Sequence, residues 1–397
     1  MQNIWSKIAT TYTDVTMKTS IKFIILLGIV SLFSDMTYEG ARSINGAYLA
    51  TLGTSAAAVG FIAGLGELVG YGLRLVSGYL ADRTQRYWLI TAVGYLINLL
   101  AVPLLALTQH WPLAAALIIA ERFGKSIRVP ARDAMLSQAG EDVGMGWAFG
   151  LHQALDQIGA MLGPLMLAGV LFFHESYQTG YALLAIPAAL ALIALYLAYR
   201  RFPNPNNLDI PAPQFARITL HPAFKLFLVG SALIGMGYAD FSLMAYHFEK
   251  TGLLQKSWIP LTYGIAMGVD ALASPLLGRL YDRQGYIVLI SAVTVSAFFA
   301  PLVFLGNASL AVLGVILWAV GMGVQDSLLR SIVGQMAPKL KKASIFGLFN
   351  MVYGVCWFLG STMMGVIYDY SIISMVVFIV FLQLSAIPLF IRVASIK

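Results

Sequence analysis

Long apolar runs recur along the whole chain, and short polar stretches separate them. An α-helix needs roughly 20 apolar residues to cross the hydrocarbon core of a bilayer. Runs of this length indicate membrane helices, because a β-barrel would show weaker segments of about ten residues with alternating hydrophobicity. Only 11% of the residues are charged, whereas about a quarter are charged in a soluble domain. The sequence therefore predicts an all-α membrane protein and excludes an ordinary soluble globule.

The apolar runs predict twelve transmembrane helices. We expect them near residues 21–50, 56–80, 87–108, 111–137, 146–172, 178–199, 222–250, 257–280, 286–306, 309–335, 344–368 and 372–394. The longest polar stretch, "RRFPNPNNLDIPAPQFARITLHP", contains five prolines, a density at which a helix does not persist. The chain is therefore expected to have an N-terminal six-helix bundle (1–200), a cytoplasmic linker (201–221) and a C-terminal six-helix bundle (222–397).

The positions of the basic residues predict the orientation in the membrane. The formal charge is +7, and most basic residues lie at the termini or in alternate connections, as Arg83 and Arg200 do. The other connections carry almost none, apart from Lys250 and Lys256. By the positive-inside rule, both termini are then cytoplasmic and the protein lies in the plasma (inner) membrane. Basic residues distributed in this way do not indicate nucleic-acid binding.

Segments of the first half recur in the second half. "GYLADR", from Gly78, recurs as "GRLYDR", from Gly278, and "AFGLHQALDQIGAMLG", from Ala148, recurs as "IFGLFNMVYGVCWFLG", from Ile345. Two independent matches at nearly the same offset indicate a duplicated chain whose halves run in parallel, an arrangement found in secondary transporters.

These motifs resemble those of the major facilitator superfamily. "GYLADRTQR" is similar to its G-x-x-x-D-R-x-G-R signature between helices two and three, except that Gln85 stands where glycine is usual. "GRLYDRQG" is a degenerate second copy. The resemblance implies two pseudo-symmetric six-helix bundles with a substrate site between them near the bilayer midplane. Acids and arginines at these helix ends are expected to form a conformational latch on the cytoplasmic side, made by Gly78, Asp82, Arg83, Arg86, Gly278, Asp282 and Arg283.

The run "ERFGKSIRVPARD" places charged residues inside the helix expected from residue 111. Each charge at the centre of a span costs about 2.5–3.5 kcal/mol, so these charges must be paired or hydrated. Two stripes with a 4, 3, 4 spacing each lie on one helical face. The basic stripe is Glu121, Lys125, Arg128 and Arg132, and the acidic stripe is Asp35, Glu39, Arg42 and Gly46. The resemblance implies that the two helices are adjacent and line a cavity, so we expect the stripes to meet around water.

A structural interpretation competes with a functional one for part of the basic stripe. Arg128, Arg132 and Asp133 can belong to the cytoplasmic mouth, with Pro130 ending the helix. Intramembrane ionisable groups deeper in their helices favour a function, as for Glu121, Arg122, Asp35 and Glu39. Lys125 is either the i,i+4 partner of Glu121 or a group that meets an anionic substrate.

Other intramembrane charges leave similar alternatives. Glu67–Arg74 and Asp326–Arg330 are spaced for same-face pairing, so structural ion pairs compete with transport roles. Asp240 and Asp270 have no basic residue nearby in the sequence, and an intramembrane carboxylate without a cationic partner suits a proton carrier.

His152 and Asp156 lie one helical turn apart. They can form a proton relay or ordinary hydrogen bonds within the bundle. Two ligands alone do not make a metal site, and no metal or other cofactor is expected.

Small residues and aromatic residues give further expectations. Gly159, Gly163 and Pro164 allow close helix packing, and they resemble the G-x-x-x-G-P motif of facilitator antiporters, which favours export by exchange. The corresponding segment of the second half lacks the proline. Tyr38 and Tyr238 occupy equivalent places in the two halves and are the aromatic residues expected to contact a substrate.

The resemblance and the intramembrane charges together predict a secondary active transporter that moves a small solute by alternating access. We expect proton coupling and slightly favour export of a drug or metabolite. The alternatives are uptake of a small metabolite, either anionic or neutral, or a non-transporting receptor or assembly factor. No catalytic triad or phosphate-binding loop indicates an enzyme. The expected partners are a small-molecule substrate, protons and membrane lipid, with no nucleic acid, and the protein is expected to be a monomer.

Two groups of candidate residues follow from this prediction. The candidates for proton coupling are Asp35, Glu39, Glu121, Asp156 and Asp240. The candidates for the substrate cavity are Tyr38, Arg42, Arg122, Lys125, Arg128, His152, Tyr238, Asp326 and Arg330.

Overall fold

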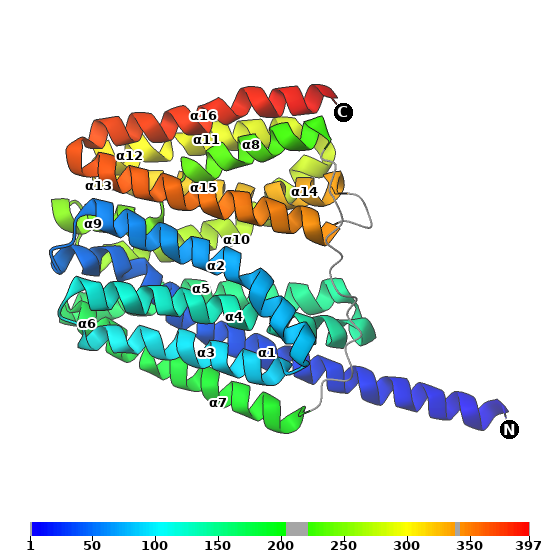
Figure 1. The fold of residues 1–397 in the computed structure, drawn as a ribbon. Helices are drawn as coiled ribbons and strands as arrows, with labels where there is room; N and C mark the ends of the chain where they lie inside the picture. The colour runs from blue at the N-terminus through cyan, green and yellow to red at the C-terminus, as the bar shows by residue number, and fades with distance from the viewer. Residues whose placement is uncertain (1, 204–220, 338–341, 397) are drawn as a thin grey trace.

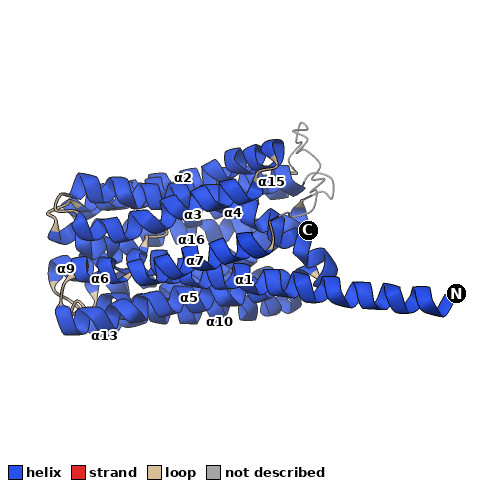
Figure 2. Ribbon diagram, turned by 90° about the horizontal axis from the view of Figure 1, so that it is seen from below, coloured by secondary structure: helices blue, strands red, loops and turns tan. Residues whose placement is uncertain are grey.

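The computed structural model describes residues 2–203, 221–337 and 342–396, and every regular element in these ranges is a helix (Figures 1 and 2). The first half contains α1 (Gln2–Thr51), α2 (Ala56–Thr84), α3 (Tyr87–Leu104) with the 3₁₀ turn η1 (Leu105–Leu107), α4 (Trp111–Val143), α5 (Met145–His174), α6 (Tyr177–Leu183) and α7 (Ala185–Arg201). The second half contains α8 (Pro222–Met236), α9 (Phe241–Thr251), α10 (Trp258–Gln284), α11 (Tyr286–Ala297), α12 (Phe299–Leu305), α13 (Ala308–Gly323), the π-helical turn η2 (Val324–Leu329), α14 (Arg330–Met336), α15 (Lys342–Tyr370) and α16 (Ile372–Ile396). The predicted linker lies almost entirely within 204–220, outside the described residues.

Eleven helical segments of the described chain are long and apolar enough to cross a membrane. Some of these segments join two labelled elements, such as α6 with α7 and α8 with α9. The predicted span that is not among them is α4, whose hydropathy is lowered by its charged residues. α4 is 33 residues long, which at 1.5 Å per residue is about 50 Å, and it packs against α1, α2, α3 and α5. The all-α, multi-span fold is therefore confirmed, and α4 carries its charges through the bundle.

Proline does not end α4. The interpretation in which Pro130 terminates this helix is wrong, because α4 continues from Pro130 to Val143. A proline inside a helix removes one hydrogen bond and is tolerated in membrane helices when neighbouring groups satisfy the backbone. Arg128 and Arg132 consequently lie in the middle of a continuous helix.

The seventh span is broken, whereas the first span is continuous. α8 ends at Met236, and α9 begins after Asp240, whose Oδ1 accepts a hydrogen bond of 2.8 Å from the backbone N–H of Ser242. An acid at this position satisfies an otherwise unpaired N–H group and interacts favourably with the helix dipole. The break thus places a carboxylate in the centre of the bundle.

The helices from α1 to α7, here the N-terminal half, lie beside those from α8 to α16, the C-terminal half (Figure 1). Between the halves α2 packs on α15, α5 packs on α10, and α1 packs on α9 and α10. Both chain termini lie at one end of the molecule (Figure 1), which we call the linker end. The opposite end, with the connections at 52–55 and 252–257, is called the far end.

Glycines allow α1 and α5 to approach closely. A Cβ atom added at Gly159 or Gly163 would lie 2.1 Å from the carbonyl oxygen of Leu32 or Met36 on α1. Pro164 follows inside α5 without ending it. These positions bring the backbones of two cavity-lining helices into contact.

Candidate functional site

A cavity of about 900 Å³ lies between the two halves. Residues of α1, α2, α4, α5, α10, α13, η2 and α15 line it. Both α5 and α15 begin at the linker end (Figure 1). The first lining residue of α5 is Gly150 and that of α15 is Phe349, each close to the beginning of its helix. The cavity therefore extends from the centre of the bundle toward the linker end.

Contacts between the halves close the far end. The Asp369 carboxylate, near the end of α15, accepts hydrogen bonds from the backbone N–H groups of Ala56 (3.1 Å) and Ala57 (2.9 Å) at the start of α2. Tyr246 donates a hydrogen bond of 3.0 Å to the carbonyl oxygen of Thr54. Every one of these contacts joins the N-terminal half to the C-terminal half.

Two further contacts tighten this closure. Tyr177 on α6 donates a hydrogen bond of 2.6 Å to Glu249 on α9. Gly46 on α1 lies against Ser242 so closely that an added Cβ would be 1.7 Å from the Ser242 carbonyl oxygen. No side chain other than hydrogen fits at position 46 while the far end is closed.

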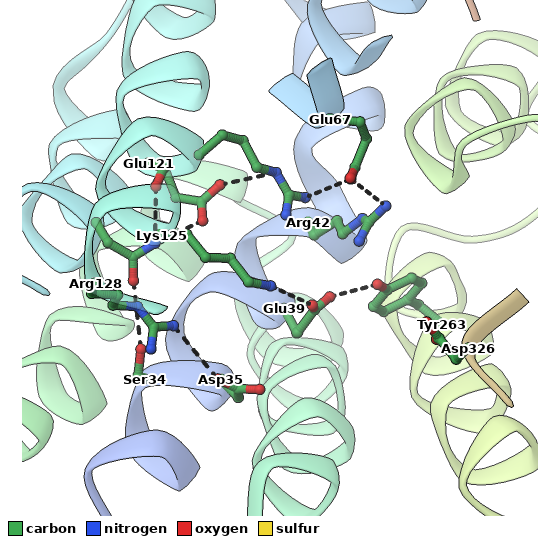
Figure 3. A network of polar contacts seen from close by, with 12 residues as sticks. Ser34, Asp35, Glu39, Arg42, Glu67, Glu121, Lys125, Arg128, Tyr263 and Asp326 are labelled. Carbon is green, nitrogen blue, oxygen red and sulfur yellow. Dashed lines mark hydrogen bonds and ion pairs between the residues drawn. The ribbon is translucent and has the colours of Figure 1, made fainter. Parts of the chain in front are cut away.

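The acidic and basic stripes meet in the centre of the N-terminal half (Figure 3). Arg128 Nη2 lies 3.8 Å from Asp35 Oδ1, and Lys125 Nζ lies 3.8 Å from Glu39 Oε1. One turn further, Arg132 donates a hydrogen bond of 3.1 Å to Ser31. The predicted meeting of α1 and α4 along these stripes is confirmed, with the two helices antiparallel.

Glu67 on α2 connects the stripes to the rest of the network. Its Oε1 accepts a hydrogen bond of 3.0 Å from Arg42 and lies 3.7 Å from Arg122 Nη2. Arg122 Nε also lies 3.3 Å from Glu121 Oε2. The predicted pairing of Glu67 with Arg74 is therefore wrong, because partners on α1 and α4 take this carboxylate.

Three polar contacts cross from this network to the C-terminal half. Arg42 donates a hydrogen bond of 2.8 Å to Asp240. Tyr263 on α10 donates a hydrogen bond of 2.6 Å to Glu39 (Figure 3). The expectation that Asp240 lacks a cationic partner is wrong, because its partner lies 198 residues away in the sequence.

The third crossing contact is at Asp270 on α10. Gln157 on α5 donates a hydrogen bond of 3.1 Å to Asp270 Oδ2, and Ser274 donates one of 3.0 Å to Oδ1. Each of the three crossing contacts ends on a carboxylate.

Several predicted cavity residues do line the cavity. They are Arg42, Arg122, Lys125, Asp326 and Arg330, together with the predicted coupling residues Asp35 and Glu39. Asp326 and Arg330 form the predicted ion pair at 3.1 Å, and both side chains are about half exposed. The remaining coupling candidates, Glu121, Asp156 and Asp240, lie behind this lining.

Tyr238, which is predicted to contact a substrate, is not among the residues that line the cavity. It is buried in the C-terminal half, where it stacks on Trp318 and donates a hydrogen bond to the Trp318 carbonyl oxygen. Tyr38, its counterpart, is also buried and lies beneath Lys125, with Nζ 3.8 Å from the ring centre. Both tyrosines support the walls of the bundle.

Arg128 and His152 also lie outside the cavity lining. The Arg128 side chain is 1% exposed and lies over the Tyr95 ring, with 4.3 Å from Cζ to the ring centre. His152 Nε2 lies 2.8 Å from Ser31 Oγ, and Nδ1 lies 3.4 Å from Asp156 Oδ2. Both residues are predicted to contact a substrate directly, but neither is among the lining residues in this conformation. Nε and Nη1 of Arg128 are buried without a hydrogen-bond partner among the described residues.

The sequence did not predict that several further residues lie in the cavity wall. Tyr71, Arg74, Gln157, Asp270 and Tyr353 all line the cavity. Arg74 and Asp270 were visible as intramembrane charges but were assigned to an ion pair and to a proton carrier. Tyrosines and glutamines within apolar runs give no signal that separates a cavity wall from ordinary packing.

The signature residues lie at the linker end. Asp82 accepts a hydrogen bond of 3.2 Å from Tyr87 of its own half, while Arg83, Arg86, Asp282 and Arg283 are exposed. Within the described ranges, no hydrogen bond or ion pair joins them to the opposite half. Gly78 faces Pro130, and Gly278 faces Ser327. The predicted latch is therefore not engaged in this conformation, among the residues that the structure describes.

The chain matches known proteins over most of its length. Residues 27–361 match the model of the Major Facilitator Superfamily. An uncharacterized protein of Mycobacterium tuberculosis is 38% identical over 372 residues, which are 92% of this chain and 91% of that protein. An uncharacterized MFS-type transporter of Methanocaldococcus jannaschii is 27% identical over 364 residues, which are 88% of this chain and 89% of that protein.

Solved structures share the fold. The nucleoside transporter NupG has a TM-score of 0.71 at 16% identity, covering 94% of this chain and 98% of that chain. A peptide transporter POT in complex with sulfate has a TM-score of 0.73 at 15% identity, covering 94% of each chain. At this level of identity the likeness shows the fold alone.

Proposed function

The chain belongs to the major facilitator superfamily of membrane transporters, and from this premise we propose that it moves a small solute by alternating access coupled to protons. The observation that carries the coupling is the set of three contacts between the halves that end on Glu39, Asp240 and Asp270. In alternating access the halves rock against each other around a central site. Contacts between the halves must break and re-form in that motion.

A proton can control these contacts because it removes the charge that holds them. The Arg42–Asp240 contact is a hydrogen-bonded ion pair at 2.8 Å, with both side chains largely buried. Hydrogen bonds to ionised groups are roughly twice as strong as neutral ones. Neutralising Asp240 therefore weakens the closed far end, and by linkage the open far end binds protons more tightly.

The sign of the pH dependence follows. Lower pH favours protonated carboxylates, so it should favour opening of the far end and closing of the linker end. Asp240→Asn removes the charge at every pH, so it should hold the protein near the low-pH distribution. This result would show that protonation of Asp240, and not of another group, changes the balance between the closed and the open far end.

Spin-label distances test this proposal without a known substrate. In a Cys356→Ser background, labels at Gln109→Cys and Gln255→Cys report the separation of the halves at the far end. We expect the long-distance population to grow as the pH falls, and we expect Asp240→Asn to abolish that dependence. Glu141→Gln, an exposed carboxylate at the linker end, is the matched control and should retain it. A distribution independent of pH in the parent protein would refute proton coupling at this network.

We further propose export as the direction, in the plasma membrane and with both termini in the cytoplasm. The glycine–proline motif at Gly159, Gly163 and Pro164 supports exchange, and the basic connections at the linker end support the orientation. The structural neighbours NupG and POT are transporters of a nucleoside and of peptides, so a small polar solute fits the proposed class. Uptake into inside-out vesicles with an acidic lumen, and none into right-side-out vesicles with an acidic medium, is the result that identifies a proton-exchanging exporter.

A further inference from the structure

Most of the charges that line the cavity are already paired. Five acids and five bases are among the lining residues, so the cavity as a whole favours neither anions nor cations. Arg42, Arg122, Lys125 and Arg330 each lie within 4 Å of a carboxylate oxygen. In the described part of the chain, one lining base and one lining acid lack an oppositely charged partner. They are Arg74 and Asp270.

Arg74 extends from α2 into the cavity wall without an ion pair among the described residues. Its Nε is buried and has no hydrogen-bond partner, and its guanidinium lies 5.3 Å from the centre of the Tyr71 ring. A buried guanidinium nitrogen without an acceptor is costly, because its hydration has been lost without replacement. An anionic group on a solute would supply the missing partner, and a planar guanidinium binds carboxylate or phosphate in a bidentate manner.

Arg330 faces the same region from the opposite half. It lines the same cavity as Arg74, and its partner Asp326 sits one turn before it on the π-helical turn η2. π-Helical turns occur frequently at functional sites. An anion bound between Arg74 and Arg330 would be attracted to both halves.

Asp270 is the complementary position on α10. Its two oxygens accept neutral hydrogen bonds from Gln157 and Ser274, and the side chain is buried within the cavity wall. A protonated amine on a solute would find here a carboxylate that forms no ion pair within the described chain.

We propose that the cavity binds an amphoteric solute, with its anionic group at Arg74 and Arg330 and its cationic group at Asp270. The inference rests on the proposed transport function but not on proton coupling. Because Arg74 belongs to one half and Asp270 to the other, such a solute would bridge the halves. A purely anionic solute would leave Asp270 without a cation, and a purely cationic one would leave Arg74 without an anion.

Thermal unfolding of the purified full chain with matched probes tests the proposal at one fixed pH. Each probe set shares one skeleton and includes a zwitterion, its amine and its acid. The sets are phenylalanine, phenethylamine and 3-phenylpropionate; leucine, isopentylamine and 4-methylpentanoate; and alanyl-alanine, its amide and its N-acetyl derivative. A ligand that binds the folded state raises the unfolding temperature, so we expect the zwitterion of at least one set to stabilise most.

Substitutions test whether Arg74 binds the anionic group of the solute and Asp270 binds its cationic group. We expect Arg74→Gln and Asp270→Asn each to weaken binding of that zwitterion about 10- to 100-fold, as loss of a hydrogen bond to a charged group does. Arg74→Lys keeps the charge but loses the planar bidentate fork, so it should bind the zwitterion more tightly than Arg74→Gln and less tightly than the parent protein. Arg279→Gln and Glu141→Gln, exposed residues outside the cavity, are the controls.

The outcomes separate this inference from the proposed coupling. If no zwitterion in the three sets stabilises the protein more than its amine and its acid do, the inference is overturned. Equal binding by Arg74→Gln and the parent protein would overturn it as well. Neither result depends on the spin-label distances, because this assay is run at a single pH.

Discussion

The two ends of the molecule differ in how the halves meet. At the far end the halves touch backbone to backbone, at Gly46 against Ser242, and a carboxylate at Asp369 accepts hydrogen bonds from the start of α2. At the linker end the signature residues Asp82 and Asp282 make no described contact with the opposite half. The cavity lies between these ends and extends toward the linker end.

This difference teaches that closure depends on a small number of local contacts. The far-end contacts involve helix ends and single side chains, so a modest change in free energy can exchange them for contacts at the linker end. The Asp369 contact at the far end uses the chemistry expected of the signature acids at the linker end, a carboxylate near a helix terminus. We infer that the two ends are alternative seals and that the central ion-pair network lies where they are coupled.

Substitution of Arg42 is expected to have the largest effect on stability. Arg42→Gln leaves the buried Asp240 without its cation, and loss of one partner from a buried pair costs about 3–5 kcal/mol. We expect this loss in the free energy of unfolding measured in mixed micelles. Arg330→Gln breaks a half-exposed pair and should cost less than about 1 kcal/mol.

A double substitution checks the cause of the Arg42 effect. Arg42→Gln combined with Asp240→Asn removes both charges of this pair and should recover the part of the lost stability that comes from Asp240, while Glu67 keeps Arg122 as a nearby cation. An additive loss in the double variant would show that Arg42 acts through Glu67 or packing rather than through Asp240.

Gly46→Ala should give the next largest effect, and it acts on the far end alone. The new methyl carbon would lie 1.7 Å from the Ser242 carbonyl oxygen, so the closed far end is excluded until the helices separate. Overpacking costs about 1–3 kcal/mol or more, which shifts the ratio of closed to open far ends about 5- to 150-fold. Spin labels at Gln109→Cys and Gln255→Cys measure the shift. Gly72→Ala, where an added Cβ meets open space, should leave the distances unchanged, and a similar shift there would contradict the explanation.

Asp369→Asn should have a smaller effect in the same direction. The amide retains an acceptor for one N–H group but loses the charge at the start of α2, worth about 0.3–1 kcal/mol. We expect up to about a five-fold increase in the open far-end population in the same distance measurement. High salt should reduce the difference between Asp369 and its variant, because it screens charge–dipole interactions. A difference that persists in high salt would argue for a steric role of Asp369.

Asp82→Asn should have the smallest effect on this conformation. Among the described residues, the Asp82 carboxylate is hydrogen-bonded only to Tyr87 of its own half, so the free energy of unfolding should change by less than about 0.5 kcal/mol. The substitution should instead destabilise the alternative conformation, in which the linker end is closed. The population of that conformation at low pH should therefore decrease. A large decrease in the free energy of unfolding would show that Asp82 already stabilises this conformation.

The sequence predicted the parts of the site that helical periodicity determines. The 4, 3, 4 spacing of Asp35 and Glu39 on one helix, and of Lys125 and Arg128 on the other, places each pair on one face, and the observed pairing follows from antiparallel packing. The charged helix α4 was predicted as a span although its composition is not apolar enough on its own. Local spacing placed each pair on one face, whereas the adjacency of the two helices was implied by the resemblance to the major facilitator superfamily.

Contacts between distant segments could not be predicted in this way. Arg42 and Asp240 are 198 residues apart, and their meeting depends on how α1 packs on the broken α8–α9 span. Glu67 had a plausible partner at Arg74 by spacing, yet the tertiary structure supplies Arg42 and Arg122 instead. Tyr38 and Tyr238 occupy equivalent places in the two halves, yet neither lines the cavity, because a place along a helix does not determine which of its sides faces the cavity.

The most direct test measures both ends under the same conditions. In the Cys356→Ser background, labels at Gln109→Cys and Gln255→Cys report the far end, and labels at Glu141→Cys and Gln284→Cys report the linker end. We predict that lowering the pH lengthens the first distance and shortens the second, with the same midpoint. Distances that change together, or one end that moves while the other stays fixed, would contradict two alternative seals coupled through the central network.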